Sequence, residues 1–131
     1  MSNLYKTTGR ELEILKVLWE QGPCSVRKVH EQIDKDGERG YTTTLKLMQI
    51  MHEKGLLHRD QSSRTHIYFP SKKEEQVEAS IIEDLKNKLF AGSAEKLVMR
   101  ALSSQTIDSS ELERIREFID NCEKQEMNKK E

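Results

Sequence analysis

The sequence predicts a mostly α-helical protein with one small β-hairpin. Apolar residues recur at helical spacing along most of the chain, and only residues 56–69 change to short apolar runs around a polar turn. Of the 131 residues, 34% are hydrophobic and 34% are charged, so the apolar supply is small for a self-sufficient globule. We therefore expect a partner chain to complete part of the core.

The first predicted helix covers Glu11 to Trp19. Its apolar residues form one stripe, and Thr8 is a suitable N-cap. We expect Gly22-Pro23 to end this helix, because glycine accepts a left-handed cap and proline cannot continue the hydrogen-bond ladder.

Two further helices are expected before residue 56. Ser25 can cap a short helix whose apolar residues lie on one side. A charged, glycine-containing loop follows at residues 35–40. A third helix should then begin at Thr42 or Thr43 and end near Lys54, with Gly55 as its C-terminal stop.

The period of the pattern changes after Gly55. Residues 56–59 and 65–69 predict two short strands around the polar turn at residues 60–64, and Pro70 closes this hairpin. Three helices followed by a hairpin are the order of elements in a winged helix-turn-helix domain. We place this domain at residues 1–70.

Residues 71–131 are predicted to form a helical dimerisation domain with a frayed tail from Glu123 onward. Ser71 with Glu74, and Asp108 with Glu111, have the spacing of capping boxes at helix starts. About 60 residues with narrow apolar stripes cannot bury much area alone. The stripe positions that we assign to the dimer contact are Val77, Ile81, Leu85, Leu89, Leu97, Leu112, Ile115 and Ile119.

The motifs of several enzyme classes are missing from the sequence. His30-Glu31 and His52-Glu53 each begin like a zinc-protease motif, but neither has the second histidine that this motif requires. Without a glycine-rich phosphate loop, a CxxC pair or a nucleophile elbow, we expect no enzymatic activity, no cofactor and no metal site. Because the sequence also lacks a membrane-span pattern and a signal-peptide core, we expect a cytoplasmic protein.

Charge is distributed unevenly along the chain. Residues 1–70 hold 11 Lys and Arg against 9 Asp and Glu, a net charge of +2, whereas the remaining residues have a net charge of −3. The asymmetry is weak, but it directs any polyanion toward the N-terminal half.

The third predicted helix is the candidate recognition helix. Leu45, Met48 and Met51 repeat every three positions and should face the core. Threonine hydroxyls at a helix start suit phosphate oxygens, a lysine one turn later can reach a phosphate or a guanine edge, and apolar residues can contact a thymine methyl. The predicted DNA contacts on this helix are therefore Thr42, Thr43, Lys46, Leu47 and Ile50. Packing of Leu47 and Ile50 against the wing or the first helix is the alternative.

Two arginines of the hairpin supply a second predicted DNA contact. Arg59 and Arg64 flank the polar tip, from which a wing can contact the sugar-phosphate backbone or the edge of the minor groove. Basic residues at a hairpin tip are usually only solvated, so this interpretation depends on the helices that precede the hairpin.

A recognisable set of segments runs along the chain: Thr8–Trp19, Gly22–Val29, Tyr41–Leu45, Met51–Leu56, Arg64–Pro70, Leu89–Ser93 and Leu97-Val98. Together they resemble the penicillinase-repressor (BlaI/MecI) family. The resemblance covers most of residues 7–102 and is most dense in the first 70.

The resemblance implies a homodimeric bacterial repressor that binds a palindromic operator as double-stranded DNA. It also implies release by an upstream signal, in which a membrane-bound metalloprotease sensor triggers cleavage in the dimerisation domain. The Asn-Phe bond that is cut in the best-known members does not occur here, and the equivalent position falls near Arg100-Ala101. Cys122 alone does not match the C-terminal cysteine cluster of related copper-responsive repressors.

Two other classes of protein stay open at this point. A winged helix can bind protein rather than DNA, with Leu47 and Ile50 as a hydrophobic patch for that partner. A ligand-responsive regulator is the other class, since pockets between helices are poorly visible from sequence.

Overall fold

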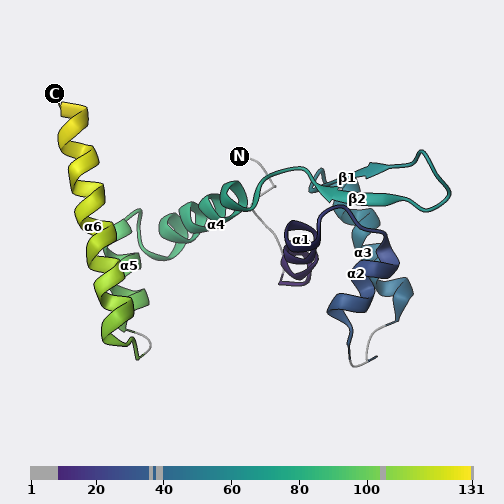
Figure 1. Ribbon diagram of the computed structural model, residues 1–131, viewed down its shortest axis with the longest axis horizontal. Coiled ribbons are helices and arrows are strands. Elements are labelled where there is room, and N and C mark those ends of the chain that lie inside the picture. Colours follow the sequence, from purple (N-terminus) through teal and green to yellow (C-terminus); the bar gives the residue numbers. More distant parts are fainter. Residues whose placement is uncertain (1–8, 36, 38–39, 104–105, 131) are drawn as a thin grey trace. The chain divides into compact units, whose positions relative to one another are not determined.

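The computed structural model describes residues 9–35, 37, 40–103 and 106–130 (Figure 1). The predicted fold class, mostly α-helical with a small hairpin, is confirmed. The chain divides into two compact units, Met1–Leu85 and Lys86–Glu131. The elements follow in the order α1 (Gly9–Gln21), α2 (Val26–Ile33), α3 (Tyr41–Glu53), β1 (Leu57–Asp60), β2 (Ile67–Pro70), α4 (Glu74–Leu89), α5 (Ala94–Ser103) and α6 (Ser109–Lys130).

Helix α1 buries one face and ends at a glycine. Gly22 has a φ of +85°, which glycine adopts without steric cost, and its N–H donates to the Leu18 carbonyl at 2.9 Å. The predicted end at Gly22-Pro23 is therefore confirmed, whereas the suggested N-cap Thr8 lies outside the described residues. The buried positions of α1 are Glu11, Ile14, Leu15 and Leu18.

Helices α2 and α3 begin and end close to their predicted positions. The Ser25 hydroxyl accepts the backbone N–H of Lys28 at 3.2 Å, so the predicted cap of α2 is confirmed. Helix α3 starts at Tyr41, slightly earlier than predicted, because Gly40 already takes the N-cap position. Gly55, with a φ of +87°, turns the chain out of α3 toward β1.

One hydrophobic core joins α1, α2, α3 and the hairpin. Ile14, Val29, Met48 and Met51 are 0% exposed, and every member of this cluster lies between Ile14 and Tyr68. Complete burial of one such large apolar side chain stabilises the fold by about 1.5–3 kcal/mol. The N-terminal unit therefore closes a core of its own.

An ion pair at the edge of this core connects the start of α1 to the end of α3. The carboxylate of Glu11 is 1% exposed, and the Lys54 ammonium donates to its Oε2 at 3.0 Å. A buried carboxylate is stable only when it is paired or hydrogen-bonded. The apolar stripe of α1 did not predict that Glu11 would be buried.

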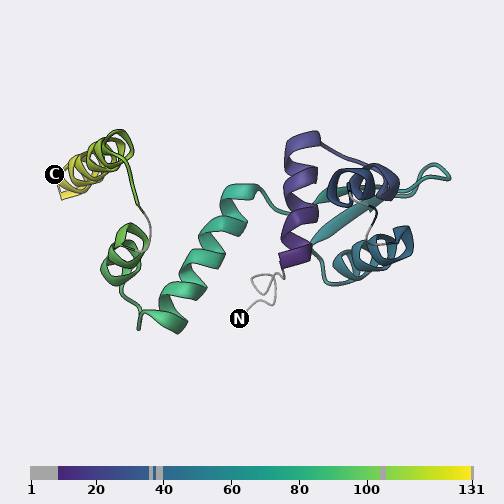
Figure 2. The same ribbon diagram turned by 90° about the horizontal axis from the view of Figure 1, so that it is seen from below.

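The hairpin is attached to the turn that precedes α2. Strands β1 and β2 are antiparallel, with Leu57 opposite Pro70 and Asp60 opposite Ile67. Cys24 and Tyr68 exchange two backbone hydrogen bonds of 3.1 and 2.8 Å, which anchor the base of the hairpin. Its tip projects beyond α2 and α3 (Figure 2). This arrangement is a winged helix-turn-helix.

The start of α4 differs from the prediction. The Ser71 hydroxyl donates to the carbonyl oxygens of Gly55 at 2.6 Å and Leu56 at 3.1 Å, so it does not cap α4. The capping box predicted from Ser71 and Glu74 is therefore wrong. Instead, the Lys73 N–H donates to Oε1 of Gln76 at 3.0 Å.

The first part of α4 belongs to the N-terminal unit. The Trp19 indole N–H donates to the Lys72 carbonyl at 3.1 Å, and Val77 is only 7% exposed. These contacts explain why the first compact unit extends to Leu85, whereas the sequence places the domain boundary after Pro70.

Helices α5 and α6 lack fully buried side chains among the residues whose burial is described. Asp108 caps α6, since its Oδ1 accepts the Glu111 N–H at 2.8 Å, and this predicted helix start is confirmed. The helix continues to Lys130, through the stretch from Glu123 for which the sequence predicts fraying. Side chains 123–129 are all exposed, so tertiary packing within the subunit does not support this stretch. None of the helices in the described ranges is long and apolar enough to cross a bilayer.

Candidate nucleic-acid interface

Helix α3 has one buried face and one polar, exposed face. Thr44, Met48 and Met51 point into the N-terminal unit. The spacing of a helix places the residues between them on the opposite side. The exposed side chains of α3 are Thr42, Thr43, Lys46, Gln49 and Glu53.

The predicted inner face of α3 needs one correction. Leu45, expected in the core, packs against it only in part and also lines a surface groove, while Thr44 occupies the inner position at 5% exposure. The Thr44 hydroxyl is 2.8 Å from Nδ1 of His30 on α2. A threonine can be buried here because this hydrogen bond satisfies its polar group.

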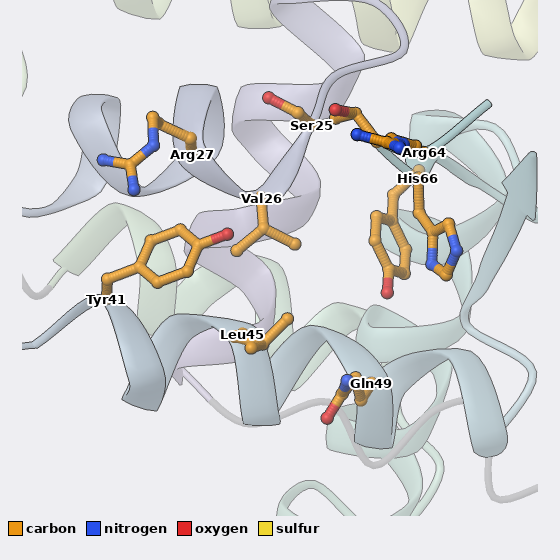
Figure 3. Close-up of a pocket in the computed structure, with 10 residues that line it drawn as sticks. Ser25, Val26, Arg27, Tyr41, Leu45, Gln49, Arg64 and His66 are labelled. Carbon is orange, nitrogen blue, oxygen red and sulfur yellow. The ribbon is translucent and has the colours of Figure 1, made fainter. Parts of the chain in front are cut away.

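The groove lies between α2, α3 and the hairpin and has a volume of about 500 Å³ (Figure 3). Its floor contains apolar side chains, and its rim contains cations from two different elements. Among the described residues that line it, none is acidic, which favours an anionic occupant. The lining residues are Ser25, Val26, Arg27, Tyr41, Leu45, Gln49, Arg64, Thr65, His66 and Tyr68.

Arg27 on α2 is held at one rim of the groove by an aromatic ring. Its guanidinium carbon lies 4.7 Å from the ring centroid of Tyr41, a cation–π distance. The ring of His30 contacts the same tyrosine edge-on, with the two ring centroids 5.9 Å apart. His30 also lies 3.4 Å from the Asp34 carboxylate. These contacts, with the His30–Thr44 hydrogen bond, fix the start of α3 against α2.

The two arginines of the hairpin have different environments. The Arg59 guanidinium lies 5.9 Å from the Tyr68 ring centroid and 3.5 Å from its hydroxyl, so it covers the flank of the hairpin. Arg64 is exposed and lines the groove. At the tip, the Ser62 N–H donates to Asp60 at 2.9 Å, and this hydrogen bond lowers the pKa of the Asp60 carboxyl.

The structure brings together only part of the predicted contact set. Thr42, Thr43 and Lys46 are exposed, as a recognition helix requires, whereas Leu47 and Ile50 are half-buried. Leu47 packs against the hydrophobic core, which is the alternative interpretation of its apolar side chain.

Arg27 and Gln49 line the groove but were not among the predicted DNA contacts. Arg27 follows the Ser25 cap in the first turn of α2, and no sequence signal was available for it, because its position next to α3 depends on the fold. Gln49 is exposed one turn beyond Leu45, and its polar side chain opposite the buried stripe was the signal there.

Residues 7–121 match the family model described as penicillinase repressor. The chain belongs to the penicillinase repressor family. This family consists of transcriptional repressors and not of enzymes. Among the described residues, no group of three or more His, Cys, Asp and Glu side chains could hold a metal ion.

Three known proteins are similar to this chain. The chain is 21% identical to a penicillinase repressor of Staphylococcus aureus, over 87% of this chain and 90% of that protein. It is 19% identical to the methicillin resistance regulatory protein MecI of Mammaliicoccus sciuri, over 88% of this chain and 94% of that protein. A solved MarR family structure from Bacillus stearothermophilus is 26% identical, with a TM-score of 0.48 over 72% of this chain and 68% of that one.

The positions assigned to a dimer contact differ in exposure within this family member. Val77 packs inside the N-terminal unit and does not offer a free surface. Leu85, Leu89 and Ile119 are exposed at 39%, 67% and 48%. The half-buried positions are Ile81, Leu97, Leu112 and Ile115. Further exposed apolar residues, which were not assigned to the dimer contact, are Ile82, Val98, Met99, Phe118 and Met127.

Proposed function

We propose that this family member represses transcription as a homodimer that binds a palindromic operator through α3 and the adjoining groove. The observation that carries the proposal is the joint placement of three cationic side chains on α2, α3 and the hairpin. Arg27 and Arg64 line the groove, and Lys46 lies on the exposed face of the helix between them.

The DNA contacts divide by chemistry. Lys46, Arg64 and the exposed Thr42 and Thr43 hydroxyls suit phosphate oxygens, which fix the position of the protein on the duplex. Arg59 contributes to the same surface from the flank of the hairpin. In a homodimer the two recognition helices would enter the major groove at half-sites about one helical turn, or a multiple of it, apart.

The C-terminal unit supports the homodimer part of the proposal. Its exposed apolar side chains include Leu89 at 67% and Phe118 at 70%, in a unit that has no closed core among its described residues. Large exposed apolar patches commonly mark interaction surfaces. A second copy of the chain supplies a matching surface by symmetry.

Release of the operator by an upstream signal is the regulatory part of the proposal. The resemblance to the family implies a membrane-bound metalloprotease sensor that triggers cleavage in the dimerisation unit of a cytoplasmic repressor. The Arg100-Ala101 bond lies in α5, where both side chains are exposed. Loss of the dimer would separate the two half-site contacts and lower operator affinity.

The test is a salt titration on duplexes selected from random DNA by the full chain. Phosphate contacts make the logarithm of the binding constant fall linearly with the logarithm of salt concentration. We expect Lys46→Ala to reduce that slope by about one per subunit and to weaken binding. Lys124→Ala on the exposed surface of α6 is the matched control and should leave the slope unchanged. Selection of no preferred duplex, or binding that does not depend on salt, would overturn the proposal.

The alternative of a protein-binding winged helix has less support. It required Leu47 and Ile50 to form an exposed patch, but both are half-buried and Leu47 packs against the core. In the same titration, a protein-binding module would show weak, sequence-independent association with DNA.

A further inference from the structure

We infer that Leu45 and Gln49 recognise A·T base pairs in each half-site, with the Gln49 amide on an adenine and the Leu45 side chain on a thymine methyl group. This inference rests on the proposed function, because it names the bases that the same surface would select. It assigns sequence discrimination to the groove side of α3 rather than to Lys46 or Leu47.

Position on the helix is the first argument. Leu45 and Gln49 are four residues apart and both line the groove, at successive turns of α3 (Figure 3). A helix rises about 1.5 Å per residue, so the two side chains are about 6 Å apart along the axis. Base pairs are stacked about 3.4 Å apart, so this spacing corresponds to about two base-pair steps.

The availability of the Gln49 amide is the second argument. Gln49 is exposed, and none of the side chains in the described part of the chain hydrogen-bonds to it. The amide carries a donor and an acceptor side by side. Adenine presents the complementary pair in the major groove, with N7 as acceptor and the N6 amino group as donor, and glutamine can bind both.

The partial exposure of Leu45 is the third argument. Leu45 touches the core but is only half-buried, so part of its side chain is available for an apolar contact in the groove. The thymine methyl group is the one apolar feature in the major groove. Leu47 and Ile50 were the earlier assignments for this contact. Leu47 packs in part against the core, as Leu45 does, but neither Leu47 nor Ile50 lines the groove.

Lys46 has a different role in this arrangement. Its long, flexible side chain ends in a point charge that binds phosphates without selecting a base. It is exposed directly after Leu45 and does not line the groove, so it can bind the DNA backbone beside the groove. Lys46→Ala should therefore weaken binding to all duplexes about equally, whereas a change at Gln49 should weaken binding to the selected sequence alone.

The experiment compares the full-length protein with its Gln49→Ala variant on the preferred duplex and on duplexes changed one base pair at a time. Gln32→Ala is the matched control, since Gln32 is exposed on α2 outside the groove. We expect Gln49→Ala to lose about five- to 150-fold in affinity for the preferred duplex and to lose its preference at one A·T pair. The Gln32→Ala variant should bind like the wild type.

Base analogues that remove single atoms or groups from the DNA test each proposed contact separately. Replacing the chosen adenine by 7-deazaadenine removes only the N7 acceptor, and this should weaken wild-type binding but leave Gln49→Ala binding unchanged. Replacing the neighbouring thymine by deoxyuridine removes only the methyl group, and a loss of about fourfold is expected from burial of one methyl. This measurement requires no change of Leu45, whose packing against the core a mutation could disturb.

The outcomes separate the two proposals. A wild-type protein that selects no preferred duplex would overturn the proposed function itself. A wild-type protein that selects a duplex, while Gln49→Ala retains the same affinity and base preference, would overturn this inference and leave the repressor function standing. Equal effects of 7-deazaadenine on the wild type and the variant would also overturn it.

Discussion

The N-terminal winged helix and the C-terminal helices use their apolar side chains in opposite ways. Ile14 and Met48 are 0% exposed, whereas Leu89 and Phe118 are 67% and 70% exposed. The first unit closes its core and can hold α3 rigidly for DNA contact. The second leaves its apolar area available, so its stability depends on a surface that covers it. Under the proposed function, a single chain would then suffice to present the DNA-binding surface, and assembly with a second copy would depend on the C-terminal helices.

The largest expected effect is on assembly. Ile119→Glu places a carboxylate in the exposed apolar stripe of α6, where a dimer would have to bury it at considerable cost. We expect sedimentation to change from dimer to monomer. Operator affinity should fall by about a hundredfold or more, because each monomer then binds its half-site independently.

Asn121→Glu is the matched control for the dimer contact. It adds the same charge at an exposed position on another side of α6. The control should remain dimeric and bind the operator normally. If Ile119→Glu also sediments as a dimer, the α6 stripe is not the dimer contact, and the contrast between the two units needs another explanation.

The next effect tests whether the first core is independent of assembly. Leu15 is 1% exposed, and Leu15→Ala should lower the free energy of unfolding by about 2–5 kcal/mol at every protein concentration. Leu89→Ala removes the same atoms from an exposed site. Its cost should be below about 0.5 kcal/mol in dilute solution and should increase only when the protein is concentrated enough to dimerise. Denaturant titrations at two concentrations measure both, and a concentration-dependent cost for Leu15→Ala would contradict the comparison.

Much of the N-terminal unit could be predicted because its signals are local. Ser25 caps α2, and the glycines at positions 22 and 55 end α1 and α3 where the sequence placed these ends. Cap chemistry and left-handed glycine turns depend on a few neighbouring residues, so they can be recognised without knowing the fold. The short apolar runs of residues 56–69 around a polar turn predicted the hairpin for the same reason.

The errors occur where tertiary contacts decide. Ser71 has the spacing of a cap, but the nearby carbonyls of Gly55 and Leu56 compete for its hydroxyl. Thr44 replaces Leu45 at the inner position because His30, on another helix, supplies a hydrogen bond. Glu11 is buried because Lys54 approaches from the end of α3. Each of these outcomes depends on a partner distant in sequence, which helical periodicity does not encode.

The candidate DNA surface could also be predicted only where local signals decide, and not where tertiary contacts do. Exposure of Thr42, Thr43 and Lys46 could be predicted from the phase of one helix. The contribution of Arg27 could not, because it requires knowing that α2 and the hairpin enclose α3 from two sides. The groove is a property of three elements together.

The smallest expected effect is the pH dependence of the Asp108 cap of α6. None of the described side chains of this helix is buried. The backbone N–H of Glu111, with help from the Ser110 hydroxyl, lowers the pKa of the Asp108 carboxyl below its ordinary value of 3.8. A carboxyl with a lowered folded pKa stabilises the helix above its ordinary pKa, and this contribution is lost as the pH falls through the lowered value.

Nuclear magnetic resonance can detect this effect at a single amide. The Glu111 N–H signal of the wild type should titrate with a midpoint below about 3.8, because the amide follows the charge of Asp108. Asp108→Asn should keep the cap and abolish the titration, since asparagine accepts the same hydrogen bond without a charge. Asp108→Ala should lower the helicity of α6 at every pH. A midpoint at or above 3.8 would mean that the Asp108 cap is not formed in solution.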